Sequence, residues 1–264
     1  MILFEDRWLI AVNKPAGVLS HPNTETPSVP PRRDCAFEGR YHFQERRFDA
    51  PGGSLWLVHR LDQDTSGVLL ATKSAEMAKK CRACFEETSP SRIRKIYLAL
   101  VAGKPSPVSG VWRDHLEKRI GHGKVRSSVL RNRPPNAELR YAVRHARAVA
   151  DRERRQGDRS SRARKRIGTP TEEEKSVSLL EIILLTGRTH QIRVQAATHR
   201  HPVAGDRIYG DFSLNRRLRH EIGLRRLFLH AWRLDFRHPM TGHFLSLEAP
   251  VPLELEKCLA RLPP

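Results

Sequence analysis

The nine residues 59–67 read His-Arg-Leu-Asp-Gln-Asp-Thr-Ser-Gly and decide how the chain is interpreted. Strand-like residues 56–60 and 68–72 surround them, and Gly67 predicts the turn between the two strands. Asp62 and Asp64 are thereby placed in a tight polar turn. An Asp that caps such a turn is the ordinary structural explanation, so the stretch needs support from elsewhere in the chain.

Two carboxylates two residues apart are also a feature of calcium-binding loops. A calcium loop that begins at Asp62 requires a bidentate Glu at its twelfth position. That position is Lys73, whose positive charge repels the metal. Residues 187–193 and 121–124 similarly depart from the phosphate-binding P-loop pattern. The sequence therefore predicts no metal site in these segments.

The rest of the chain predicts an α+β fold with a mainly antiparallel mixed sheet, flanked by helices and loops. Residues 1–264 are expected to form a single domain with a central cleft, and residues 22–54 an irregular surface loop. Residues 144–176 are expected to be a basic insertion, mobile or helical. The expected strands are residues 1–7, 9–12, 56–60, 68–72, 96–102, 137–143, 178–185, 227–236 and 244–247. The expected helices are residues 74–87, with Ser74 as N-cap, 191–198 and 253–262.

The charge of the chain favours a polyanionic partner. Lys and Arg number 48 against 29 Asp and Glu, which gives a formal net charge of +19 over 264 residues. Neutralising phosphates releases condensed counterions, so an excess of this size is typical of RNA-binding proteins. Part of it lies in residues 144–166, but the remainder of the chain is basic too. Nothing approaches the roughly 18 apolar residues of a membrane span. An anionic membrane surface is the alternative polyanion, which would require basic residues on one amphipathic helix with aromatic anchors, and no membrane partner is expected.

The four cysteines are too few for a disulfide scaffold and predict a cytoplasmic protein. Cys81 and Cys84 form a CxxC pair without a second pair of matching spacing, which argues against zinc. Met77, Cys81, Cys84 and Phe85 instead follow the apolar stripe of one helix, which predicts core cysteines.

Two further segments allow alternatives when each is taken alone. In residues 186–193 (Thr-Gly-Arg-Thr-His-Gln-Ile-Arg), Arg188 and Arg193 could bind phosphate or pair with a buried carboxylate, or simply begin a solvated helix. Tyr97 shares a strand face with Lys95 and Ala99, where a core-edge tyrosine is the ordinary explanation.

Taken together, these segments resemble the RluA-type pseudouridine synthases. Residues 59–67 match the catalytic motif HRLDxxTSG, residues 95–99 the tyrosine motif and residues 186–193 the arginine motif TGRxHQIR. Residues 13–17 with 21–22, residues 201–206 with 209–210, and residues 230–242 are similar to the other segments of the family. The six matches occur in the family order and cover nearly the whole chain.

The resemblance implies a role for each matched residue. Asp62 would be the nucleophile, Tyr97 would stack on the target uracil, and Arg193 would pair with the Asp62 carboxylate. Arg60 would fill the gap that the flipped nucleotide leaves in the RNA stack. The other residues expected to bind substrate are His59, Thr65, Arg188, His190 and Lys14. The isomerisation involves no net redox change, so no cofactor is expected.

The function predicted from the sequence is isomerisation of specific uridines in structured rRNA or tRNA by a monomer without an obligate protein partner. A non-catalytic RNA-binding protein on the same fold is the first alternative. A nucleosidase is the second, because an Asp near C1′ can also support N-glycosidic cleavage. No separate N-terminal S4-like domain is expected, since Phe4 already belongs to the catalytic domain.

Overall fold

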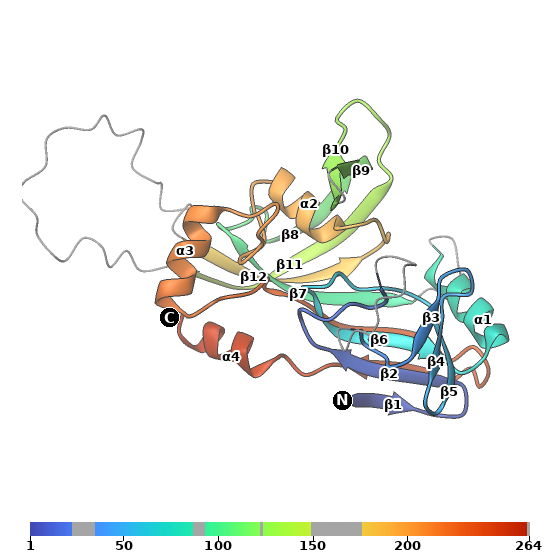
Figure 1. The fold of residues 1–264 in the computed structure, drawn as a ribbon. Helices are drawn as coiled ribbons and strands as arrows, with labels where there is room; N and C mark the ends of the chain where they lie inside the picture. The colour runs from blue at the N-terminus through green and yellow to red at the C-terminus, as the bar shows by residue number, and fades with distance from the viewer. Residues whose placement is uncertain (23–34, 87–92, 122–123, 149–175, 263–264) are drawn as a thin grey trace, which may run out of the picture.

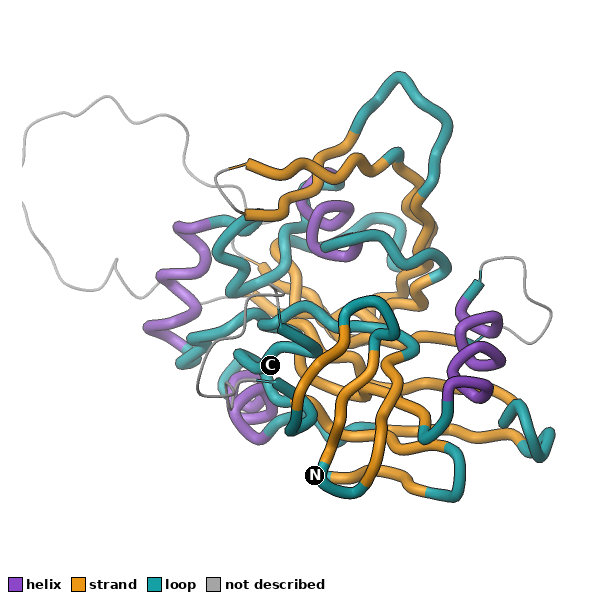
Figure 2. Tube along the Cα trace, turned by 45° about the vertical axis from the view of Figure 1, so that its right-hand side comes forward, coloured by secondary structure: helices purple, strands orange, loops and turns teal. Residues whose placement is uncertain are grey.

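The computed structural model describes residues 1–22, 35–86, 93–121, 124–148 and 176–262. In these ranges one large, mainly antiparallel sheet and a separate hairpin are flanked by helices (Figures 1 and 2). The predicted α+β class is confirmed. The strands are β1 (Ile2–Glu5), β2 (Leu9–Lys14), β3 (Arg40–His42), β4 (Arg47–Ala50), β5 (Gly53–Leu57), β6 (Ser66–Thr72), β7 (Arg94–Ala102), β8 (Ser109–Asp114), β9 (Leu116–Gly121), β10 (Lys124–Val129), β11 (Ala137–Ala148), β12 (Ser176–Leu184), β13 (Leu229–Arg237) and β14 (Phe244–Glu248). The helices are α1 (Ala75–Phe85), α2 (Gln191–Thr198), α3 (Phe212–Glu221) and α4 (Leu253–Ala260).

The order of the strands brings distant segments together. The sheet runs β3-β4-β5-β6-β13-β7-β12-β11-β8, while β2 also pairs with β6, β1 with β2, and β14 with β13. Between the described strands the ladders are antiparallel, except that β13 runs parallel to β6. Because β6, β13, β7 and β12 are neighbours, the loop before β6, the middle of β7 and the segment between β12 and α2 converge.

Helices cover both faces of the central strands. On β7, Tyr97 and Ala99 join the cluster that contains Ile192 of α2, whereas Leu98 and Leu100 join the cluster that contains Leu218 of α3. Alternate residues of a strand point to opposite faces, so α2 lies on one face and α3 on the other. Burial of each of these Leu and Ile side chains contributes about 1.5–3 kcal/mol.

Gly67 corrects one prediction. It lies inside β6 rather than in a turn, and its φ of +120° suits glycine. A Cβ there would lie 2.1 Å from the carbonyl oxygen of Ala231 on β13. Gly67 therefore permits the close parallel approach of β13, and the turn comes earlier, where Thr65 N donates to Asp62 O at 3.1 Å. The preceding strand β5 ends at Leu57, short of the predicted residue 60.

The prediction of an irregular loop at residues 22–54 is wrong for its second half. Strands β3, β4 and β5 form an antiparallel extension of the sheet there. Phe48 is fully buried in the core although its neighbours are charged, and these charges hid the strand pattern. The two described ends of the predicted basic insertion, residues 144–176, belong to strands, where a mobile or helical segment was expected. Residues 144–148 continue β11 and Ser176 begins β12, while residues 149–175 lie outside the described residues.

The strand β8, the β9–β10 hairpin and the helix α3 were not predicted. Helix α3 has the apolar pair Leu214 and Leu218 on its buried side and is otherwise rich in arginine, which masked its periodicity. Helix α1 agrees with the prediction, since the Ser74 hydroxyl caps it by accepting from Met77 N at 3.2 Å, and Cys81 is buried as a free thiol. Within the described ranges, no helix has the length and apolar character needed to span a bilayer.

Candidate active site

A cavity of about 350 Å³ opens where the loop before β6, strand β7 and the β12–α2 segment converge. This volume is at the lower end of the range for small-molecule sites. All the predicted site residues except Lys14 line it. Its polar lining includes Arg46, His59, Arg60, Asp62, Thr65, Lys95, Tyr97, Arg188, His190 and Arg193, and its apolar lining includes Val58, Leu61, Phe85, Leu184, Ile192 and Leu229.

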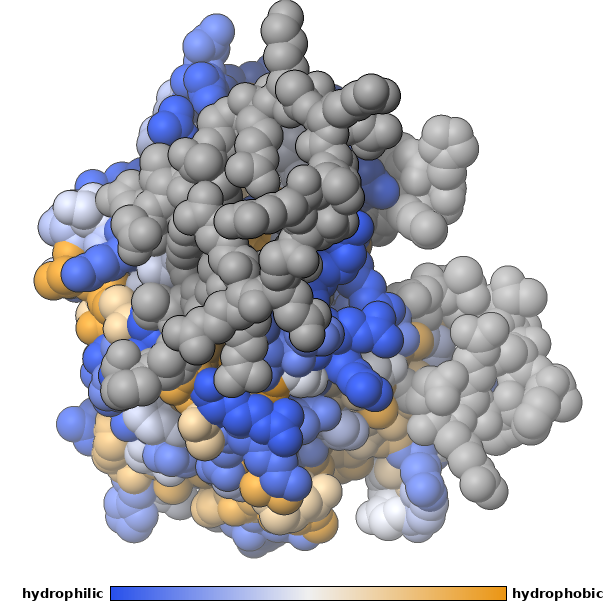
Figure 3. Space-filling view, turned by 90° about the vertical axis from the view of Figure 1, so that its left-hand side faces the viewer, coloured by the Kyte–Doolittle hydropathy of each residue, from blue (hydrophilic) through white to orange (hydrophobic). Residues whose placement is uncertain are grey.

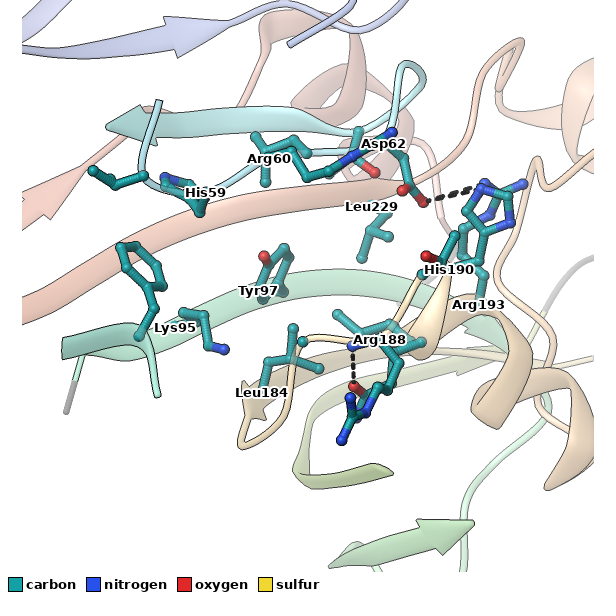
Figure 4. Close-up of a pocket in the computed structure, with 18 of the residues that line it drawn as sticks. His59, Arg60, Asp62, Lys95, Tyr97, Leu184, Arg188, His190, Arg193 and Leu229 are labelled. Carbon is teal, nitrogen blue, oxygen red and sulfur yellow. Dashed lines mark hydrogen bonds and ion pairs between the residues drawn. The ribbon is translucent and has the colours of Figure 1, made fainter. Parts of the chain in front are cut away.

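The two oxygens of Asp62 have different surroundings. Oδ2 accepts a hydrogen bond from Nη1 of Arg193 at 3.3 Å, and Nε2 of His190 lies 4.0 Å from the same oxygen (Figure 4). Among the described residues, Oδ1 takes part in no hydrogen bond or ion pair. The side chain is 22% exposed, so solvent and ligands can reach it. One oxygen is thus anchored while the other is available for chemistry.

Arg193 is held in place by a second, buried carboxylate. Its Nε and Nη2 donate to the two oxygens of Asp206 at 2.7 and 2.8 Å, and Asp206 also accepts from the backbone N–H groups of Ile208 and Tyr209. Burial acts to lower the pKa of Arg193, but Asp206 and then Asp62 outweigh it and raise that pKa. Arg193 is therefore a permanent cation whose third nitrogen is directed at Asp62.

Tyr97 forms the wall of the cavity opposite Asp62. In Figure 4 its side chain projects from β7 into the space below the carboxylate and beside Leu229. It is 8% exposed, and burial followed by the nearby negative charge of Asp62 raises the pKa of its phenol. Tyr97 therefore stays protonated at neutral pH and presents an uncharged aromatic group.

His190 occupies a left-handed backbone position immediately before α2, with φ of 54° and ψ of 24°. Its Nδ1 lies 2.9 Å from the Tyr209 hydroxyl, which in turn accepts from the backbone N–H of Ser127 on β10 at 2.8 Å. Burial lowers the pKa of His190, and the charge of Asp62 only partly opposes this effect. The imidazole is therefore neutral at neutral pH.

Lys14, which was predicted to bind substrate, is not among the residues that line the cavity. It is fully buried, and its Nζ donates to the carbonyl oxygens of Pro15, Val18 and Gln63 at 2.9, 2.6 and 3.0 Å. Burial, with a smaller effect of Arg226, lowers the pKa of Lys14 to about 8. Its three donors are used to tie the segment after β2 to the residue that follows Asp62.

Two other predicted residues, His59 and Thr65, line the cavity but are held within the protein. His59 Nε2 accepts a hydrogen bond from Leu70 N at 2.9 Å, and its ring stacks on Phe85. These two contacts fix the start of the loop between β5 and β6. Thr65 is buried, and among the described residues its hydroxyl has no hydrogen-bond partner although it borders the cavity.

Exposed cations surround the opening. Arg60 follows β5, Arg46 lies on the β3–β4 turn, and Arg188 lies before α2, where its Nε donates to Asn136 O at 2.9 Å. Arg46 and Lys95 were not predicted as site residues, and neither were Asp206 and Tyr209. Both Asp206 and Tyr209 belong to a segment that resembles the family, so the signal was present without a role attached. Within the described ranges, no cluster of three His, Cys, Asp or Glu side chains could hold a metal.

Comparison with known proteins identifies the family to which this cavity belongs. The family model described as RNA pseudouridylate synthase matches residues 8–198. The chain belongs to this family. It is 34% identical over 264 residues to ribosomal large subunit pseudouridine synthase C of Escherichia coli K12, with 99% of this chain and 70% of that protein covered. The Pasteurella multocida protein of the same name is 33% identical over 268 residues, covering 99% and 67%.

Solved structures of family members agree in fold. Human RNA pseudouridylate synthase domain containing 4 superposes with a TM-score of 0.63 at 24% identity, covering 99% of this chain and 92% of that one. The resemblance inferred from the motifs is thus confirmed, and the protein is an RNA pseudouridine synthase, an isomerase that acts on RNA. This result disfavours the non-catalytic alternative.

Proposed function

We propose that this enzyme converts specific uridines of ribosomal RNA into pseudouridine, with Asp62 as the nucleophile. The observation that carries the proposal is the asymmetry of the Asp62 carboxylate. Arg193 anchors Oδ2, which leaves Oδ1 without a protein partner among the described residues, at the edge of a partly apolar cavity. Ribosomal RNA is favoured over tRNA because the bacterial relatives are named as ribosomal large subunit enzymes.

The reaction requires this kind of carboxylate. Isomerisation breaks the N1–C1′ bond of uridine, turns the base and forms a C5–C1′ bond, with no net oxidation or reduction. A carboxylate can attack the sugar, attack the base or abstract a proton, and each route uses an ionised oxygen that faces the substrate. Burial alone disfavours the ionised form, whereas an adjacent guanidinium stabilises it. Arg193 supplies that guanidinium, and Asp206 keeps it in place.

The cavity suits a single base outside the RNA stack. A uracil within a duplex or stacked loop is unreachable, so it must be flipped out before it can react. Tyr97 offers an aromatic face to the planar base, and Leu184 and Leu229 complete an apolar surround that retains it between bond cleavage and bond formation. Arg60 is exposed at the rim, where its side chain can fill the gap in the RNA stack.

Cations near and beyond the cavity can bind the RNA backbone. The β9–β10 hairpin exposes Lys118, Arg119 and Arg126. Helix α3 adds exposed Arg216 and Arg219. On the face shown in Figure 3, hydrophilic residues form much of the visible described surface. Each phosphate contact from such a cation adds to the salt dependence of binding.

The proposal is tested by incubating the purified protein with ribosomal RNA and with tRNA that lack pseudouridine, and then mapping the modified positions. The expected result is pseudouridine at a small number of ribosomal positions. Release of free uracil in place of pseudouridine would establish a nucleosidase, and modification confined to tRNA would refute the ribosomal target. The monomeric state and cytoplasmic location stay predictions.

A further inference from the structure

A chain of polar groups leads from the β9–β10 hairpin to the Asp62 carboxylate. The backbone N–H of Ser127 donates to the Tyr209 hydroxyl at 2.8 Å, and that hydroxyl lies 2.9 Å from Nδ1 of His190. The other imidazole nitrogen, Nε2, lies 4.0 Å from Oδ2 of Asp62. The Tyr209 ring also stacks under the guanidinium of Arg193, 5.3 Å from its centre. Tyr209 therefore touches both residues that flank the anchored oxygen of Asp62.

The direction of the hydrogen bonds in this chain follows from the donors available. An amide N–H can only donate, so the Tyr209 oxygen is the acceptor for Ser127. The phenol has one proton of its own, and Nδ1 of His190 is its only acceptor among the described residues. A neutral imidazole that accepts at Nδ1 carries its proton on Nε2. The proton of His190 is then on the nitrogen that faces Asp62.

We propose that Tyr209 is a positioning residue, which fixes His190 in the Nε2–H tautomer so that His190 donates to Oδ2 of Asp62 and leaves Oδ1 as the reacting oxygen. This inference rests on the proposed role of Asp62. The 4.0 Å separation is longer than a hydrogen bond, so the donation requires a small shift of the His190 side chain toward Asp62.

The tautomer is measured directly by ¹⁵N NMR of the imidazole nitrogens at pH 7.5. The protein has 13 histidines, and the His190 signals are those that disappear in the His190→Gln variant. The expected pattern for His190 is a protonated Nε2 and an unprotonated Nδ1, which changes to a mixture of tautomers in Tyr209→Phe. A proton on Nδ1 in the wild type, or an unchanged signal in Tyr209→Phe, overturns the proposal. Because this readout does not depend on turnover, it stands apart from a failure of the Asp62 assignment.

Kinetics supply the second test. Tyr209→Phe keeps the ring against Arg193 but removes the hydroxyl, and we expect kcat to fall about tenfold, as for one lost hydrogen bond, with KM unchanged. Tyr141→Phe is the control, since Tyr141 is a buried tyrosine outside the cavity lining whose hydroxyl donates to Pro107 O at 3.1 Å, whereas Tyr209 is half-buried. A rise in KM with kcat unchanged in Tyr209→Phe contradicts the proposal. An equal fall in kcat in Tyr209→Phe and Tyr141→Phe contradicts it too.

Two substitutions of His190 separate its two nitrogens. The side-chain amide of Gln reaches the position of Nε2, whereas that of Asn reaches only the position of Nδ1. We expect His190→Gln to retain kcat within about threefold of wild type and His190→Asn to lose about tenfold. Backbone strain predicts the reverse order, because Asn adopts the left-handed conformation more readily than Gln. Addition of Tyr209→Phe to His190→Gln should lower kcat no further, and an additive loss would overturn the link.

Discussion

Asp206→Asn is the substitution that tests most severely how the site is held together. Asp206 is 1% exposed and receives four N–H groups, two from Arg193 and two from the backbone of Ile208 and Tyr209. In the Asn variant one oxygen becomes an NH₂ group. Whichever way the amide is turned, this group faces at least one donor, so a hydrogen bond is replaced by a contact between two donors.

The magnitude follows from the charge that is left behind. Removing one partner of a buried ion pair destabilises by about 3–5 kcal/mol. Asp62 remains as a second partner of Arg193 at 3.3 Å, so the lower end, about 3 kcal/mol, is expected. At about 2–4 °C per kcal/mol for a chain of this size, Tm falls by about 6–12 °C. Since Arg193 is no longer fixed, kcat should fall as well.

Thermal and urea unfolding of Asp206→Asn provide the measurement, and Asp211→Asn is the matched control. Asp211 caps α3 by accepting from Ser213 N and Leu214 N, and Asn serves equally well as an N-cap. The control should therefore remain within about 0.5 kcal/mol of wild type. If Asp206→Asn is as stable as the control, the buried pair does not hold Arg193 in the way described.

Three other substitutions test the surroundings of the catalytic loop. The pKa of His59 is lowered to about 3 by burial, below its unfolded value near 6.5. Between these two pH values the unfolded state binds more protons, so stability falls by up to about 1.4 kcal/mol for each unit by which the pH is lowered. His59→Gln should therefore lose less stability to urea than the wild type between pH 7 and pH 5, and equal losses would contradict this. Gly67→Ala should destabilise by about 3 kcal/mol or more, because of backbone strain and the overlap of the new Cβ with β13. Gly52→Ala is the control in the same urea titration and should be neutral, since nothing lies within 4 Å of a Cβ at that position. Lys14→Met removes the Nζ donor from three carbonyl oxygens, of which Gln63 O keeps the Gly17 N–H at 2.9 Å. It should destabilise by about 2–4 kcal/mol with a lower kcat, and an unchanged kcat would show that Lys14 does not position the loop.

Local pattern predicted much of this structure, because the elements that surround the site have strong local signals. Helix α1 has a capping Ser74, and β2, β6 and β12 are runs of apolar residues. The meeting of Asp62, Tyr97 and Arg193 was expected from the family resemblance and not from local pattern. These residues lie on three separate segments, and only the sheet order brings them together.

What the sequence did not predict depends on long-range packing. Gly67 is a turn residue by local rules, but its function is set by the backbone of β13, which is distant in sequence. The pairing of Arg193 with Asp206 could not be chosen from the many acidic residues of the chain. Lys14 matched the family motif, yet its burial and its three carbonyl partners are properties of the folded loop.

Whether the Asp62 carboxylate performs the chemistry is measured by the single-turnover rate of pseudouridine formation. Asp62→Asn preserves size and should reduce this rate by at least about 10⁴-fold, since Asn lacks the ionised oxygen that reacts, while RNA affinity changes little. Asp64→Asn, two residues further on, should retain the rate within a few fold. An Asp62→Asn protein that forms pseudouridine at a rate within tenfold of wild type would contradict the account.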